Sequence, residues 1–172
     1  MVDPQILILA ANEYPLPWDG IHVLDHWARV LENGERLAQV TGADMQVVSL
    51  FAVLHDCRRE NEGCDHRHGP RAAALIDELG PAQLKLDEDQ FARLSYAIAM
   101  HTEGLTQADI TVQTCWDSDR LDLMRCWIEP HPRKLCTAAA RDPEILAWAI
   151  GRGHSRVVPD LVDQWLKILS GQ

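Results

Sequence analysis

The chain has 172 residues, of which 47% are hydrophobic and 24% are charged, and its formal net charge is −10 at pH 7. This balance is typical of one globular domain with a packed core and excludes a disordered chain. Because an acidic surface repels phosphate backbones and anionic lipids, we expect neither a nucleic acid nor a membrane as a partner.

Helical patterns dominate the first part of the chain. The apolar run over residues 6–11 is too short to distinguish a helix from a strand. Residues 19–42 place apolar side chains at helical spacing and stop at Gly42, a common residue just after a helix. Residues 44–56 are apolar on almost every side, which indicates a helix in the middle of a bundle.

The rest of the chain is also helical in pattern. Residues 69–80 have proline near their start and glycine at their end. Asp87 with Gln90 three residues later predicts a capping box that begins a helix over residues 87–102. Later helices are predicted over residues 117–128, 142–151 and 159–170. Strand-like alternation and internal repeats are missing, so the sequence predicts an all-α, single-domain helical bundle over residues 1–172.

Cysteine use and the N-terminus indicate the cellular compartment. The five cysteines are an odd number without regular spacing, which is typical of reduced thiols in an intracellular protein. The N-terminal sequence MVDPQ is acidic, and the apolar stretch after it is too short for a signal peptide. No segment approaches the roughly 20 apolar residues that cross a bilayer. We therefore expect a cytoplasmic protein, and nothing in the sequence indicates its oligomeric state.

The predicted helices direct several histidines and acids toward the core. His22 and His26 are four residues apart and share one helical face. His55 and Asp56 end the most apolar helix, and since adjacent helical residues diverge by ~100°, one ion between them can contact both. His101 continues the inner stripe of its own helix. Buried charges are costly unless they are paired or bind a metal.

An ordinary core and a metal centre are the two explanations of this set. A lone inward histidine is usually hydrogen-bonded within a core, and Arg120 between two acids suits a surface ion pair worth about 0–1 kcal/mol. As a set, together with Asp119 on a partly buried segment, these side chains predict a metal site in the bundle interior. Neutral imidazole with carboxylate favours Mn, Fe, Ni, Co or Zn over Mg.

A thiolate zinc site is the competing kind of metal site. Its ligands would be Cys57, Cys64, His66 and His68. Six residues separate the two cysteines, whereas about two to four is usual in such sites. The histidine–carboxylate site is therefore the preferred prediction.

Five separated segments resemble the motifs of the HD-domain superfamily of metal-dependent phosphohydrolases. In chain order they are HVLDHWARV, LFAVLHDCRRE, DHRHGPRAA, IAMHT and WDSDRLDL, and they span residues 22–122. The sequence is most similar to a bacterial branch in which HDxxRE is followed by a His-Gly-x-Arg-Ala-Ala segment. The resemblance implies a motif core over residues 20–125, with the C-terminal helices packed on the same domain.

By motif position, the resemblance also implies a set of metal ligands. They are His26, His55, Asp56 and Asp119. His22 falls outside the ligand positions of the motif, and we expect Asp117 to lie directly behind the ligands. His68 and His101 fall where superfamily members with two metals have extra histidines. His66 fits less well, because His68 is the residue directly before the glycine of the motif.

The resemblance implies chemical roles for these residues. Asp56 or Asp119 could take a proton from a metal-activated water. Arg59 falls where the superfamily often has a basic residue and is the predicted phosphate-binding group, whereas Arg58 and Arg71 suit a solvated surface equally well. One ion is expected and two are possible; with one ion, His68 and His101 would act as acid–base or phosphate-binding groups.

Three functions are consistent with this site. The first is hydrolysis of a phosphomonoester or phosphodiester in a nucleotide-like or other small phosphorylated molecule. The second is oxidation by a di-iron centre, since superfamily relatives with two irons and extra histidines are similar to oxygenases. The third is binding of a nucleotide or metal without turnover, as in a sensing module. The hydrolase is the favoured prediction.

Overall fold

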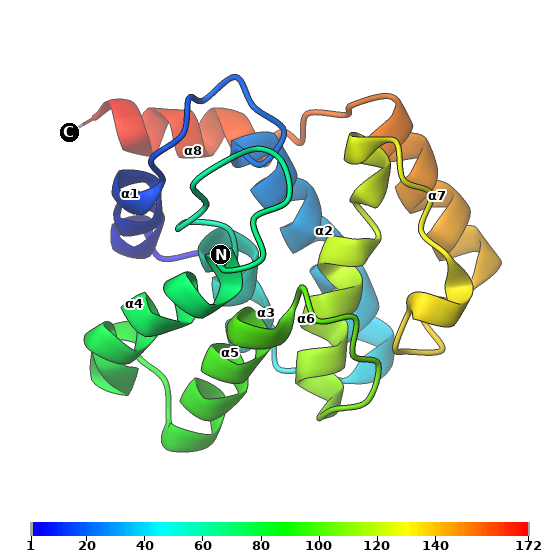
Figure 1. The fold of residues 1–172 in the computed structure, drawn as a ribbon, viewed down its shortest axis with the longest axis horizontal. Helices are drawn as coiled ribbons and strands as arrows, with labels where there is room; N and C mark the ends of the chain where they lie inside the picture. The colour runs from blue at the N-terminus through cyan, green and yellow to red at the C-terminus, as the bar shows by residue number, and fades with distance from the viewer. Residues whose placement is uncertain (1, 172) are drawn as a thin grey trace.

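The structure, a computed structural model, describes residues 2–171 and is helical in all its regular elements. In chain order these are α1 (Pro4–Glu13), α2 (Leu24–Thr41), α3 (Met45–Leu54), α4 (His68–Leu84), α5 (Glu88–Met100), α6 (Ile110–Arg120), the 3-10 helices η1 (Leu123–Cys126) and η2 (Pro132–Lys134), α7 (Pro143–His154) and α8 (Leu161–Ser170). No strand occurs in the described residues, so the expected all-α fold is confirmed (Figure 1). None of the helices between residues 2 and 171 is both long enough and apolar enough to cross a membrane.

Local sequence signals set the ends of the central helices. Asp44 begins α3, because its side chain accepts hydrogen bonds from two backbone N–H groups of the first turn. α2 ends at Gly42, whose φ of +72° is a conformation that glycine adopts without steric cost. Asp87 and Gln90 form the predicted capping box of α5. The sequence thus determines where α2 ends and where α3 and α5 begin.

The helix bounds differ from the prediction in three main places. The helix predicted over residues 117–128 is instead α6, which ends at Arg120 and is followed by the short η1. It begins early because Asp109 accepts a hydrogen bond from the Thr111 N–H, whereas the threonines and valine of its first turns, which are weak helix formers, conceal this start in the sequence. The second difference is in α4, which continues beyond Gly80 after a kink where that residue has a φ of +71°. The third is in α2, which begins at Leu24 and not at residue 19, because the backbone at Val23 is extended.

Helix α3 lies in the middle of the bundle. It packs against α1, α2, α5 and α6, and Val47, Val48, Phe51 and Leu54 are completely buried. In Figure 1, α4 lies beside α5, and α8 lies near α1, where it also contacts α2. Helix α7 packs against η1. The extent of the domain over residues 1–172 stays a prediction.

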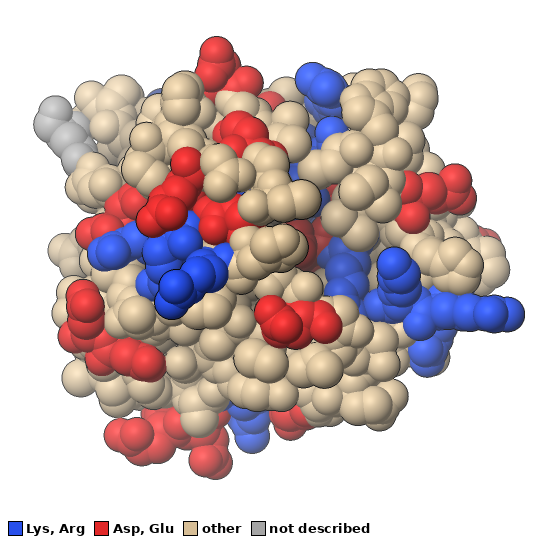
Figure 2. Space-filling view, viewed as in Figure 1, with Lys and Arg blue, Asp and Glu red and all other residues tan. Residues whose placement is uncertain are grey.

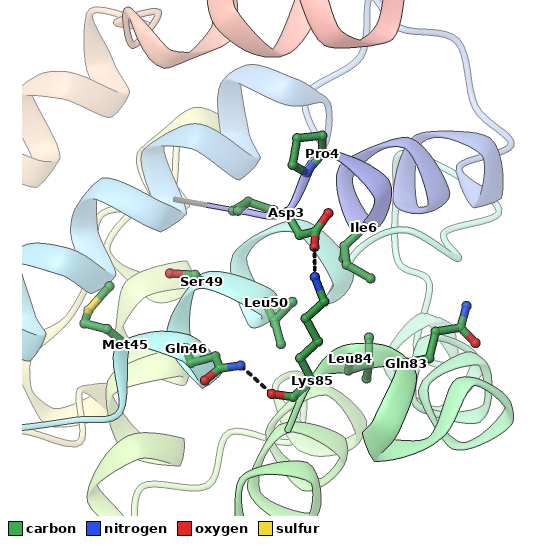
Figure 3. A pocket seen from close by; sticks show the side chains of 11 residues that line it. Asp3, Pro4, Ile6, Met45, Gln46, Ser49, Leu50, Gln83, Leu84 and Lys85 are labelled. Atoms are coloured by element: carbon green, nitrogen blue, oxygen red, sulfur yellow. Dashed lines mark hydrogen bonds and ion pairs between the residues drawn. The ribbon is translucent and has the colours of Figure 1, made fainter. Parts of the chain in front are cut away.

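A hollow of about 690 Å³ lies where α1, α3 and the end of α4 meet (Figure 3). Lys85 Nζ lies 2.7 Å from Asp3 Oδ2, and Gln46 Nε2 donates a hydrogen bond to Lys85 O at 2.7 Å. Apolar side chains such as Leu50 and Leu84 line other parts of the hollow. It contains none of the predicted site residues, so the candidate site lies elsewhere.

Candidate metal centre

The predicted site residues converge from the ends of five helices. His26 is in the first turn of α2, His55 and Asp56 follow α3, His68 begins α4, His101 follows α5, and Asp119 lies in the last turn of α6. The side chain of Asp119 is 13% exposed, and the others are buried. Helix ends carry unpaired backbone groups and tolerate polar neighbours, so a polar cluster can form there without interrupting a helix.

Four donor atoms lie close enough together to bind one ion. His26 Nε2 is 3.1 Å from His55 Nε2 and 3.5 Å from both Asp56 Oδ2 and Asp119 Oδ1. His55 Nε2 is 3.6 Å from Asp56 Oδ2 and 3.8 Å from Asp119 Oδ1. Ligands at ~2.0–2.2 Å from one ion are ~2.8–3.6 Å apart in tetrahedral or octahedral geometry. Four of the five distances lie in this range and the fifth, between His55 and Asp119, is slightly longer, so the four-donor group is close to the spacing that a single divalent transition metal requires.

Hydrogen bonds orient the two imidazoles of the four-donor group. His55 Nδ1 lies 3.1 Å from Phe51 O, a carbonyl that can only accept, so this nitrogen carries the proton. His26 Nδ1 lies 2.8 Å from Asp122 Oδ2, and Arg29 Nε donates to the other oxygen of that carboxylate at 2.7 Å. Both Nε2 lone pairs consequently face the cluster. Such carboxylate–histidine contacts fix ligand orientation and increase basicity.

The protonation states match those of metal ligands. Burial lowers the pKa of His55 to about 3, so its imidazole is neutral near pH 7. Burial acts to raise the pKa of Asp56, but His55 and the hydrogen-bonding histidines around it hold that pKa well below its usual value. For Asp119, burial is likewise outweighed by Arg125 and His55, and the pKa is lowered. Neutral imidazoles and ionised carboxylates are the forms that bind a divalent cation.

The other carboxylate oxygen of Asp56, Oδ1, faces a second group of side chains, outside the four-donor group. His68 Nε2 lies 2.9 Å from Asp56 Oδ1, and His101 Nε2 lies 3.8 Å from the same oxygen. The two histidine Nε2 atoms are 2.7 Å apart. Arg59 Nη1 lies 3.2 Å from His68 Nε2 and 3.4 Å from Asp56 Oδ1. The structure thus brings both extra histidines and Arg59 to the cluster, while their chemical roles stay predictions.

A solved structure supplies the comparison with known proteins. It is described as a crystal structure of a predicted HD superfamily hydrolase from an uncultured Thermotogales bacterium. It is 25% identical to this chain and superposes with a TM-score of 0.67 over 95% of this chain and 90% of that chain. The chain belongs to the HD superfamily. No protein-family model matches the sequence, and no curated protein matches it either.

Three residues of this HD-superfamily site, His22, Asp122 and Arg125, were given no site role by the motifs. His22, which falls outside the motif's ligand positions, lies with Nδ1 2.9 Å from Asp56 Oδ2 and forms a possible three-donor group with His26 and Asp56. The expectation that His22 and His26 share one helical face is wrong, because α2 begins only at Leu24 and His22 lies in the segment before it. Asp122, the acid after Asp-Arg-Leu, orients His26 from behind. Its position depends on how the chain turns after α6, which the sequence pattern does not specify.

Asp117 lies away from the ligands, contrary to our expectation. Its carboxylate accepts hydrogen bonds from the backbone N–H groups of Cys136, at 2.7 Å, and Thr137, at 2.8 Å, and from the Thr137 hydroxyl at 2.8 Å. No hydrogen bond or ion pair connects it to the four-donor group within residues 2–171. Asp117 therefore fastens the segment after η2 to α6 and has a structural role.

The thiolate alternative has no support in the geometry. Cys57 is buried, and burial raises the pKa of its thiol to about 12. Cys64 and His66 are exposed. Within residues 2–171, the groups close enough to hold an ion consist of histidine and aspartate alone. The cluster of the HD-superfamily fold is therefore the candidate metal centre of this chain.

A cavity of about 460 Å³ opens beside the cluster. Asp56 and Asp119 lie in its wall with three arginines, Arg59, Arg120 and Arg125. Apolar side chains, Ile21, Leu123 and Ile128 among them, form other parts of the wall. Figure 2 shows acidic side chains recessed near the middle of one face, with lysine and arginine side chains on either side. Because Glu62 also lines the cavity, three carboxylates face three arginines there, so the wall is much less negative than the chain as a whole, whose net charge is −10.

Proposed function

We propose that the protein is a metal-dependent phosphohydrolase that cleaves a phosphomonoester or phosphodiester in a small phosphorylated molecule. The observation that carries this proposal is that Asp56 and Asp119, the two carboxylates of the four-donor group, lie in the wall of a cavity that also contains three arginines. Cations attract a phosphate that an acidic surface would otherwise repel. The solved structure similar to this chain is described as a predicted HD superfamily hydrolase, which supports the reaction class.

The residues that would hold the ion are His26, His55, Asp56 and Asp119. Their donor set suits Mn, Fe, Ni, Co or Zn better than Mg, because two of the four donors are imidazole nitrogens. A divalent ion bound there would lower the pKa of a coordinated water toward about 7 and stabilise negative charge on a phosphoryl oxygen.

The chain's own groups would handle the proton and the leaving group. Asp56 is ionised and has one oxygen on each side of the cluster, so it is placed to accept a proton from an attacking water. His68 and His101 lie against the opposite oxygen and can donate a proton or a hydrogen bond to the phosphoester.

Arg59 serves first to hold this arrangement together. Its Nε donates to Asn61 O at 3.3 Å and its Nη2 donates to Gly63 O at 2.8 Å, while Nη1 faces His68 and Asp56. These contacts fasten the loop before α4 and position His68. That Arg59 also binds phosphate stays a prediction.

The cavity favours a small molecule as the substrate. Its volume of about 460 Å³ lies within the ~300–1,000 Å³ range of small-molecule sites. Its apolar wall residues could contact a base or another apolar group, while the arginines face the phosphate. A nucleotide-like metabolite combines both features.

Oxidation by a di-iron centre is a second candidate, and one observation favours it. Asp56 Oδ1, His68 Nε2 and His101 Nε2 form a second three-donor group that shares Asp56 with the first. A carboxylate between two ions would be needed for such chemistry. Two irons per chain and a coloured protein would favour the oxygenase, whereas one ion and release of phosphate would favour the hydrolase.

The test is metal analysis combined with a phosphate-release screen. We expect one divalent transition metal per chain and metal-dependent release of phosphate, or cleavage of a diester, from at least one member of a panel of nucleotides and sugar phosphates. His55→Ala should abolish both, whereas His66→Ala, which changes an exposed histidine of the same region, should affect neither. Metal-loaded protein that cleaves no member of the panel would contradict the proposal.

A further inference from the structure

Arg125 is a buried arginine in the cavity wall whose individual role the proposed function does not define. It belongs to η1 and its side chain is 7% exposed. Nη2 lies 3.5 Å from Asp119 Oδ1 and 3.4 Å from His22 Nδ1. The guanidinium therefore lies directly beside the four-donor group.

The hydrogen-bonding capacity of Arg125 is largely unused. Nε and Nη1 are buried and have no hydrogen-bond partner within residues 2–171. Nη1 is 4.0 Å from Asp122 Oδ2, which is too far for a hydrogen bond. Two other arginines, Arg58 and Arg152, each have one such buried nitrogen, but each also has a nitrogen in an ion pair with a glutamate. Buried donors without a partner are rare and call for an explanation.

The other two arginines of the cavity differ from Arg125 in this respect. All three nitrogens of Arg59 contact groups of the chain. Arg120 donates from Nη1 to Lys134 O and from Nη2 to Leu105 O, so both of its terminal nitrogens are occupied. Of the three cavity arginines, Arg125 is thus the one that has two nitrogens without a hydrogen-bond partner within residues 2–171.

Arg125 borders two cavities. A small cavity of about 70 Å³ is lined by Arg125 together with Gly20, His26, Arg29 and Arg156. Arg125 also lines the larger cavity of the candidate site, so it forms part of the wall between the two. The guanidinium therefore borders the larger cavity, in which a ligand would lie beside Asp119.

We infer that Arg125 binds the phosphoryl group of the substrate beside the proposed metal ligand Asp119. The inference rests on the proposed phosphohydrolase function and adds its phosphate-binding residue. A guanidinium presents parallel N–H donors that match two oxygens of a phosphate, which suits it to this role better than a point charge. The contact with Asp119 places the bound phosphoryl group next to the metal ligands. Arg59 then has mainly the positioning role described above.

The experiment measures binding of inorganic phosphate to the metal-loaded protein by calorimetry, with metal content determined in parallel. We expect Arg125→Gln to weaken phosphate binding by about 10- to 100-fold at unchanged metal content, because a charge-assisted contact is lost. Arg125→Lys should fold with its charge intact and give a smaller loss, since only the two-donor geometry is removed. Arg58→Gln, at an ion pair outside the cavity wall, is the matched control and should bind phosphate as the wild-type protein does.

The possible outcomes separate this inference from the function on which it rests. Wild-type affinity for phosphate in Arg125→Gln, loss of metal from that variant, or no phosphate binding by the wild-type protein would overturn the assignment of Arg125. If phosphate binds through Arg125 but no phosphoester is cleaved, the assignment stands and the hydrolase proposal fails. If substrate is cleaved, Arg125→Gln should raise KM for it, and an unchanged KM would again count against Arg125.

Discussion

The two carboxylate oxygens of Asp56 face two groups of side chains that differ in charge, although both groups consist largely of histidine. On the Oδ2 side, His26 and His55 are joined by a second carboxylate, Asp119. On the Oδ1 side, His68 and His101 have no second carboxylate among residues 2–171, and a guanidinium lies 3.4 Å from the oxygen. A guanidinium also lies beside the first group, with Arg125 Nη2 3.5 Å from Asp119 Oδ1, so the second carboxylate is what distinguishes the two sides. Two carboxylates offset the charge of a divalent cation, whereas one carboxylate offsets only half of it. The Oδ2 side therefore suits an ion, and the Oδ1 side suits a phosphate or a proton.

Replacement of Asp56 should have the largest effect, because this residue belongs to both groups. Asp56→Asn removes the shared negative charge, and we expect the purified protein to lose most of its metal and all measurable turnover. Elemental analysis and thermal titration with manganese, nickel or zinc provide the measurement. Saturating metal at a hundredfold excess over its Kd stabilises the wild-type protein by about 2.7 kcal/mol, and the variant should lose this gain. A variant that retains stoichiometric metal would show that Asp56 is not a ligand.

Changes on the Oδ1 side should separate turnover from metal binding. We expect His68→Ala and His101→Ala to retain the full metal content of the wild-type protein. Their turnover should fall by about 10²–10⁴-fold, as is usual when an acid–base group is removed. Metal analysis and initial rates on the same preparations measure both quantities. A metal content that falls by half in either variant would instead indicate a second ion and would reverse our interpretation of this side.

Replacement of Asp122 should have a smaller effect, limited to metal binding by the group around Asp56 Oδ2. Its carboxylate contacts His26 Nδ1 and Arg29, but none of the proposed donor atoms that face the ion. Replacement of such an orienting group typically lowers metal affinity by about 10–100-fold, and we expect this of Asp122→Asn. Competition with a chelator measures the affinity. Asp163→Asn, an exposed acid in α8, is the control and should leave the affinity unchanged.

The fold could be predicted from the sequence because its signals are local. The capping box at Asp87 and the glycine at position 42 act within one helical turn, and the structure has both. The all-apolar stretch of α3 could be recognised as central because no other position would bury it. Helix α6 was misplaced because its start depends on one capping residue, Asp109, ahead of weak helix formers.

The candidate site could be predicted only in part. The resemblance gave the positions of His55 and Asp56, and the structure brings them together with the other motif residues. Asp122 and Arg125 reach the cluster because the chain folds back through η1 after α6, which no helical periodicity encodes. Asp117 was wrongly expected to lie directly behind the ligands, because it is only two positions from Asp119. Its carboxylate instead accepts hydrogen bonds from backbone N–H groups after η2.

Gly69 provides the smallest test of the comparison, because it controls the approach of the Oδ1 histidines without carrying any chemistry. A Cβ at this position would lie 2.7 Å from Ile98 O and 3.2 Å from His101 Cε1. Gly69→Ala must therefore push α4 away from α5, and we expect a loss of about 1–3 kcal/mol in the free energy of unfolding. Turnover should fall as His101 is displaced from His68, while metal content should not change.

The control is Gly151→Ala in α7, where the new Cβ would have no neighbour within 4 Å among the described residues beyond its own stretch of helix. This change should instead stabilise the protein by up to about 1 kcal/mol. Denaturant titrations of both variants measure these changes, and equal stability of the two would mean that α4 and α5 do not depend on the glycine for their close contact.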